Sequence, residues 1–142
     1  MKKAKRLLAF GAAAMMLAAS LSFPASAANT KDKPWNFSVD YSNKPYTTAL
    51  REKTNASGVY VYYKEGTVNG VICDVLNSEG DSMCRKKGVV PKEARRLIAQ
   101  YVYENGFRLC RLKLQSNTIT ISGGAGGVWS PDSAGSYPYA NL

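Results

Sequence analysis

Residues 1–27 of this 142-residue chain have the pattern of a secretory signal peptide, which decides where the remainder folds. A basic start, MKKAKR, is followed by an uninterrupted run of apolar and small residues from Leu7 to Leu21. This run of about 15 residues is shorter than the ~20 that a membrane span requires. Ala25-Ser26-Ala27 supplies the small residues that signal peptidase recognises, and it predicts cleavage after Ala27. We therefore expect a secreted protein that is extracellular or associated with the cell wall.

The chain beyond the signal peptide has the length of one domain. Residues 28–33 are polar, and we expect a frayed N-terminus there. A single β-rich domain is predicted over residues 34–132, and a flexible tail over residues 133–142, which have little to bury. No second long apolar run occurs, so we expect no integral membrane anchor.

Alternation of apolar and polar residues is the main signal for secondary structure. Trp35, Phe37, Val39 and Tyr41 alternate with polar residues, which predicts a strand with one buried face. Further strands are predicted over residues 59–63, 71–76, 107–114 and 118–122, whereas the glycine-rich residues 123–127 are interpreted as flexible. Many short strands separated by turns indicate an all-β fold after the signal helix, a small antiparallel two-sheet sandwich.

Residues 91–106 admit two interpretations. In the first, which we favour, they form a strand that is joined to a second strand, residues 107–114, by a hairpin turn at Asn105-Gly106. Read as a helix over about residues 92–105, they begin after Pro91 and end at the same Asn-Gly pair. The helix would change the fold class to α+β.

The sequence contains no histidine, which removes the commonest general base and the commonest metal ligand. Catalysis by Ser-His-Asp or Cys-His is excluded, as are zinc sites built with histidine. Glu104 and Asp132 are candidates for a carboxylate pair, but nothing in the sequence brings them together. We expect no enzymatic activity, no cofactor and no metal site.

Three cysteines, Cys73, Cys84 and Cys110, follow the signal peptide. Cys73 and Cys110 each share a strand face with apolar residues, so both are expected to point into the core. The odd number permits one disulfide, Cys73–Cys110, and equally permits three buried thiols.

Charge and aromatic residues give the candidate binding residues. Four of the 19 basic residues lie in the signal peptide. The chain after it has 15 basic and 10 acidic residues, which gives it a net charge of +5. The basic candidates are the clustered Arg85, Lys86, Lys87, Lys92, Arg95 and Arg96. The aromatic candidates are Tyr60 and Tyr62, because alternation must expose at least one of Tyr60, Tyr62 and Tyr63. The partners we expect are an anionic cell-wall polymer or a membrane surface, with no nucleic acid.

Several short motifs resemble a loose group of small secreted β-rich proteins of Gram-positive bacteria. The group shares a closing Gly-x-Trp-Ser-Pro-Asp-Ser motif, here Gly127 to Ser133. The other matching motifs are Lys53-Thr54-Asn55-x-Ser57, Tyr60-Val61, Tyr101-Val102-Tyr103-Glu104-x-Gly106, Leu112 and Ser122-Gly123. The resemblance implies export and a small β-rich domain, and it carries no catalytic or binding residues.

Two functions are compatible with these features. The first is a secreted non-catalytic protein that interacts at the cell envelope or with extracellular partners. The alternative is a secreted, bacteriocin-like antagonist that acts on the envelopes of competitors.

Overall fold

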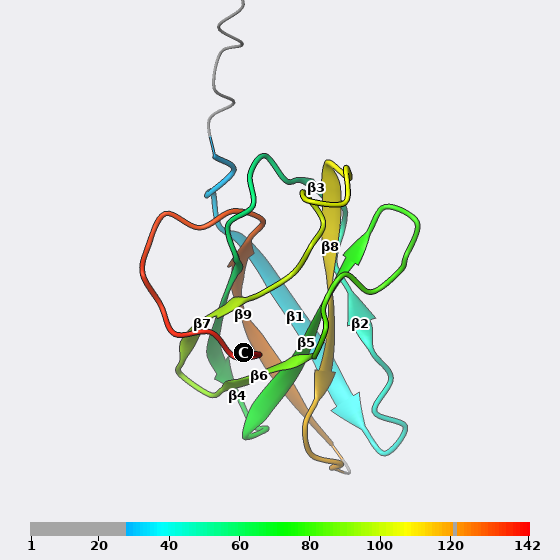
Figure 1. Cartoon of the computed structure of the whole chain (residues 1–142). Helices are drawn as coiled ribbons and strands as arrows, with labels where there is room; N and C mark the ends of the chain where they lie inside the picture. Colours follow the sequence, from blue (N-terminus) through cyan, green and yellow to red (C-terminus); the bar gives the residue numbers. More distant parts are fainter. Residues whose placement is uncertain (1–27, 121) are drawn as a thin grey trace, which may run out of the picture.

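A computed structural model describes residues 28–120 and 122–142, and the interpreted signal peptide lies outside this part of the chain. The described chain is all-β, and its two antiparallel sheets pack against each other as a sandwich (Figure 1). The predicted fold class is therefore confirmed. No helix long and apolar enough to cross a membrane is found among the described residues.

The four-stranded sheet contains strands from both ends of the chain. Its order is β1 (Lys33–Asp40), β9 (Ser122–Ser130), β4 (Val59–Gly66) and β7 (Arg95–Ile98). Strand β9 is central and pairs along its whole length with β1, so the start and the end of the domain are neighbours.

The five-stranded sheet contains the middle of the chain. Its order is β2 (Tyr46–Thr47), β8 (Leu109–Ser116), β5 (Gly70–Asn77) and β6 (Gly88–Pro91), and β3 (Arg51–Glu52) also pairs with β8. Strands β6 and β7 are the outer strands of their sheets, and they contact each other on one side of the sandwich.

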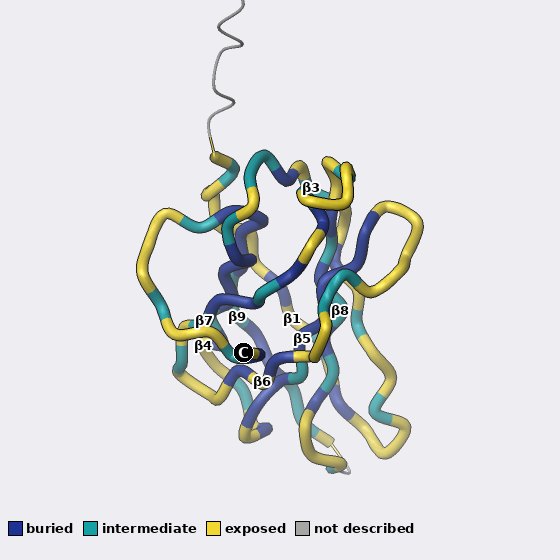
Figure 2. The backbone as a smooth tube through the Cα atoms, in the orientation of Figure 1, coloured by how far each residue is buried: buried dark blue, intermediate teal, exposed yellow. Residues whose placement is uncertain are grey.

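The core lies between the sheets, where the inward-facing side chains of both meet. Figure 2 shows buried stretches along strands of both sheets. Trp35 and Trp129 from the neighbouring strands β1 and β9 are both fully buried there. The alternation that predicted the first strand is confirmed, since Trp35 and Val39 face this core.

The glycine-rich segment is a strand, contrary to the expectation that it is flexible. Gly126 and Gly127 lie in the middle of β9, between β1 and β4, opposite a bulge between Tyr63 and Glu65 of β4. A Cβ atom on Gly127 would lie 1.8 Å from the carbonyl oxygen of Tyr62. Glycine is therefore required by the close approach of β4 rather than by flexibility. The strand expected over residues 118–122 is also wrong, because residues 118–120 form a loop that leads into β9.

Neither interpretation of residues 91–106 is correct in full. Strand β7 ends at Ile98 and pairs with β4, so residues 91–106 are not one arm of a hairpin with residues 107–114. Residues 102–106 form a turn. The turn is closed by hydrogen bonds from Asn105 N to Tyr101 O and from Gly106 N to Tyr103 O, both 3.0 Å. The Asn-Gly signal thus marks a turn, but the strands on either side of it belong to different sheets.

All three cysteines are free thiols, so the Cys73–Cys110 disulfide is not formed. Both side chains are buried in the core, as expected, but Cys110 lies opposite Asn77, four residues along β5 from Cys73. Four residues of strand span ~13 Å, whereas the Cα atoms of a disulfide lie within ~7 Å. Burial raises the pKa of Cys110 and that of Cys84 to about 12, which keeps these thiols protonated.

The tail predicted over residues 133–142 makes contacts with the domain. In the tail, Tyr139 forms a parallel β-bridge with Leu97 at the outer edge of β7. The buried Asn141 amide donates to Lys86 O (2.8 Å) and to Ala99 O (2.9 Å). These two bonds tie the tail to the loop before β6 and to the end of β7.

The geometry of β9 predicts different effects for two neighbouring glycines. Gly127→Ala should lower the free energy of unfolding by about 3 kcal/mol, because the new methyl group displaces backbone. Gly126→Ala is the control, since its Cβ would meet nothing closer than 3.5 Å. Urea denaturation of the two variants measures the difference, and equal stabilities would contradict the packing described for β9.

Candidate functional site

A buried ion pair joins two motifs that are distant in the sequence. Lys53 follows β3 and Asp132 follows β9, and Lys53 Nζ lies 2.8 Å from Asp132 Oδ1 with both side chains fully buried. The ammonium also donates to Ser57 O (2.7 Å) and to Pro131 O (2.8 Å), so all three of its protons are used. The Lys-Thr-Asn-x-Ser and Trp-Ser-Pro-Asp-Ser motifs thus meet at this pair.

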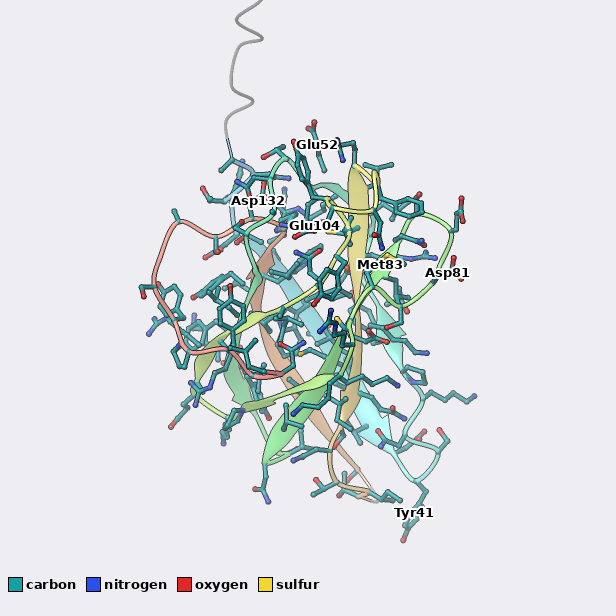
Figure 3. The ribbon with its side chains drawn as sticks, viewed as in Figure 1. Tyr41, Glu52, Asp81, Met83, Glu104 and Asp132 are labelled. Carbon is teal, nitrogen blue, oxygen red and sulfur yellow. The ribbon has the colours of Figure 1, made fainter. Side chains whose placement is uncertain are left out.

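The other oxygen of Asp132 holds the N-terminal segment and the chain after β3. Asp132 Oδ2 accepts hydrogen bonds from Asn29 N (2.8 Å), Thr54 Oγ1 (2.7 Å) and Thr54 N (3.2 Å). Three separate segments of the chain therefore converge on one carboxylate at one end of the sandwich (Figure 3).

The same bonds determine the protonation of Asp132. Burial alone would raise the pKa of this carboxyl group, but hydrogen bonds from Lys53, Thr54 and the Asn29 amide outweigh burial and leave the pKa below its ordinary value. A general acid for glycoside chemistry needs the opposite shift. Glu104, the other carboxylate considered, is exposed in the turn that follows β7.

Next to the ion pair, the N-terminal segment and the tail enclose a pocket of about 250 Å³. We call it the tyrosine pocket, and it is lined by Thr30, Asp32, Tyr60, Ser130, Ser133, Ala134, Gly135 and Tyr137. Asn29 and Asp132, which bond to each other, immediately precede the two stretches that form its walls. The ion pair therefore positions both walls.

Tyr60 and Tyr62, the predicted aromatic candidates, lie in alternate positions of β4, with Leu97 opposite Tyr60 and Arg95 opposite Tyr62. Tyr60 is 9 % exposed because the ring of Tyr137 covers it at a centroid distance of 5.1 Å. Tyr62 is half-buried, with the Arg95 guanidinium 4.2 Å from its ring centroid. Burial raises the pKa of the Tyr60 hydroxyl, although its hydrogen bond with Arg95 acts in the opposite direction.

The six basic candidates lie on the side of the sandwich formed by β6 and β7, and we call them the basic edge. They are Arg85, Lys86 and Lys87 in the loop before β6, Lys92 after β6, and Arg95 and Arg96 in β7. Within residues 28–120 and 122–142, the Lys53–Asp132 pair is the one salt bridge, so none of the six is paired with an Asp or Glu side chain there. Lys86 Nζ donates a hydrogen bond to Leu142 O (3.2 Å).

Part of the basic edge borders a second pocket of about 320 Å³. Its lining combines two cations with apolar surface: Arg85, Lys86, Ala99, Tyr101, Asn141 and Leu142. The Arg85 guanidinium lies 5.2 Å from the ring centroid of Tyr101. The end of the tail therefore lies beside Arg85, Lys86 and Tyr101.

The sequence did not indicate the walls of the tyrosine pocket. Thr30, Asp32, Ser133 and Tyr137 all lie in segments expected to be frayed or flexible. The sequence feature that could have indicated this end of the sandwich is the pair of motifs that contain Lys53 and Asp132. A lysine in one motif and an aspartate in the other are compatible with an ion pair between them. Among the described residues, no group of three or more Cys, Asp or Glu side chains is placed to hold a metal ion.

Comparison with family models gives one match, to the family described as a protein of unknown function (DUF2712), over residues 23–133. The chain belongs to the DUF2712 family. No curated protein and no solved structure matches the chain. The DUF2712 region includes Lys53, Asp132 and the basic edge, whereas Tyr137 and the end of the tail lie beyond it.

Loss of one partner of the ion pair should be strongly destabilising. Asp132→Ala would leave the Lys53 ammonium buried without its counter-ion, and we expect the free energy of unfolding to fall by about 3–5 kcal/mol. Glu104→Ala removes an exposed carboxylate and serves as the control. Urea denaturation of both variants measures the change. A similarly small loss of unfolding free energy in the two variants would show that the ion pair does not stabilise the fold.

The lowered pKa of Asp132 also predicts how its contribution depends on pH. A carboxyl group with a depressed pKa stabilises the fold above its unfolded-state pKa of ~3.9, and the stabilisation is lost as the pH falls through the folded-state value. The stability difference between the native sequence and Asp132→Ala should therefore be constant near neutral pH and should narrow below pH ~4. A difference that grows on acidification would contradict the direction of this pKa shift.

Proposed function

We propose that this DUF2712 protein is a secreted, non-catalytic protein that binds an anionic polymer at the cell envelope through the basic edge. The observation that carries the proposal is the gathering of six cations along one side of the sandwich, none of them paired with an Asp or Glu side chain among the described residues. An excess of cations along one side produces a positive potential that attracts polyanions.

The geometry of the edge supports binding to an extended partner. The loop before β6 and the end of β7 belong to different sheets, and the Asn141 amide links them through Lys86 O and Ala99 O. Arg85 and Arg95 each lie against a tyrosine ring, which restricts the guanidinium while leaving the residue exposed. The charges are thus spread along a surface of restricted geometry, which suits repeated anionic groups better than a single small anion.

Binding to purified cell walls tests this proposal. The protein should co-sediment with anionic walls at low salt, and binding should fall steeply as the salt concentration rises, because screening weakens the attraction. Replacing both Lys86 and Lys87 by Ser should weaken binding about thirtyfold, using ~1 kcal/mol for each lysine near an anionic surface.

The matched control replaces Lys33 and Lys44 by Ser. These exposed lysines lie in β1 and in the turn after it, on the side of the sandwich opposite β7. The control removes the same charge, so equal weakening by both pairs would indicate an unspecific effect of net charge. Absence of co-sedimentation at low salt would overturn the proposal.

A further inference from the structure

The tyrosine pocket contains polar side-chain groups that have no hydrogen-bond partner within the described chain. The Asp32 carboxylate and the hydroxyl groups of Thr30 and Ser133 line the pocket, and none of these three groups forms a hydrogen bond there. Asp32 and Thr30 are exposed, and Ser133 is half-buried. The pocket thus presents several acceptors and donors to a ligand rather than to the protein itself.

Aromatic surface lies next to these polar groups. The Tyr60 and Tyr137 rings meet at an interplanar angle of 42°, which forms a bent apolar wall. Tyr137 folds back over Gly135, and a Cβ atom on Gly135 would lie 2.5 Å from its ring. The glycine therefore permits the position that Tyr137 takes above Tyr60.

The charges around the pocket favour a neutral ligand. Asp32 would repel an anion at the mouth of the pocket. A cation would lie near two guanidinium groups just outside the lining: Arg95, 4.2 Å from the ring centroid of Tyr62, and Arg51, whose Nη2 donates to Lys31 O beside Asp32. Neither an anionic polymer nor an ammonium group is therefore a good match, whereas a neutral polyhydroxylated molecule avoids both repulsions.

We propose that the tyrosine pocket is a binding site for a neutral saccharide. The C–H face of one sugar ring packs against the ring of Tyr137, which lies over Tyr60, while adjacent sugar hydroxyls donate to the Asp32 carboxylate and exchange hydrogen bonds with Thr30 and Ser133. The pocket volume of about 250 Å³ is below the range of drug-sized sites, which suits one sugar unit of a longer chain.

Titration followed by two-dimensional amide NMR tests the site, with four neutral tetrasaccharides as probes: chitotetraose, cellotetraose, maltotetraose and mannotetraose. At least one should give saturable shifts centred on residues 30–32 and 130–137, with a dissociation constant in the millimolar range, ~10 mM or tighter. Because the ligand is neutral, affinity should be unchanged by salt, which distinguishes this site from the basic edge.

Variants of the pocket make the test specific. Asp32→Ala should weaken binding about tenfold or more, because sugar hydroxyls lose a charged acceptor. Asp32 makes no hydrogen bond within the described chain, so the variant leaves the fold intact. Tyr137→Ala should also abolish binding, whereas Tyr137→Phe retains the ring and should retain most of the affinity.

The matched controls are Glu79→Ala and Tyr41→Ala. Glu79 is an exposed carboxylate in the loop after β5, and Tyr41, 67 % exposed, lies at the other end of the sandwich (Figure 3). Both should leave sugar binding unchanged. The inference is overturned if none of the four probes gives saturable shifts, or if the shifts persist in both Asp32→Ala and Tyr137→Ala.

Discussion

The Lys53–Asp132 ion pair is the interaction on which the arrangement of both chain ends depends. Removing two charges from water is costly, and a buried pair is stable only when the remaining hydrogen-bonding groups are satisfied. Here Lys53 uses all three of its protons, and Asp132 accepts from the N-terminal segment and from Thr54 as well as from Lys53. The pair therefore links the segment before β1, the chain after β3 and the chain after β9. Replacement of either partner would leave the other buried without compensation, which makes the contact specific as well as strong.

The tyrosine pocket and the basic edge both depend on the hydrogen bonds that hold the N-terminal segment and the tail to the sandwich. The walls of the tyrosine pocket are the chain just after Asn29 and the chain on either side of Asp132, so the pocket exists because these residues are bonded to each other. The basic edge depends on the far end of the tail, where Asn141 links the loop before β6 to the end of β7. One terminal segment thus contributes to the tyrosine pocket at its start and supports the basic edge at its end.

The errors of interpretation have a common physical origin. Gly123 to Gly127 have the composition of a linker, yet β9 is a central strand, because β1 and β4 approach it so closely that a side chain on Gly127 would collide with Tyr62 O. The Asn105-Gly106 pair does make a turn, but β7 pairs with β4 rather than with β8. Cys73 and Cys110 both face the core, yet the register of β5 and β8 places them four residues apart. In each case the sequence pattern is a real local feature, but its structural role depends on which distant segments pair with it.

The sequence by itself determined the all-β class, because the period of two in residues such as Trp35, Phe37 and Val39 is local and is imposed by the pleat of a strand. It also determined the absence of imidazole chemistry and the existence of a basic cluster. Only the tertiary structure decided that Asp132 is a buried partner of Lys53, that Tyr60 is covered by Tyr137, and that Asp32 faces a pocket. These facts join residues separated by more than 70 positions, and such contacts depend on strand order and register, which no local pattern encodes.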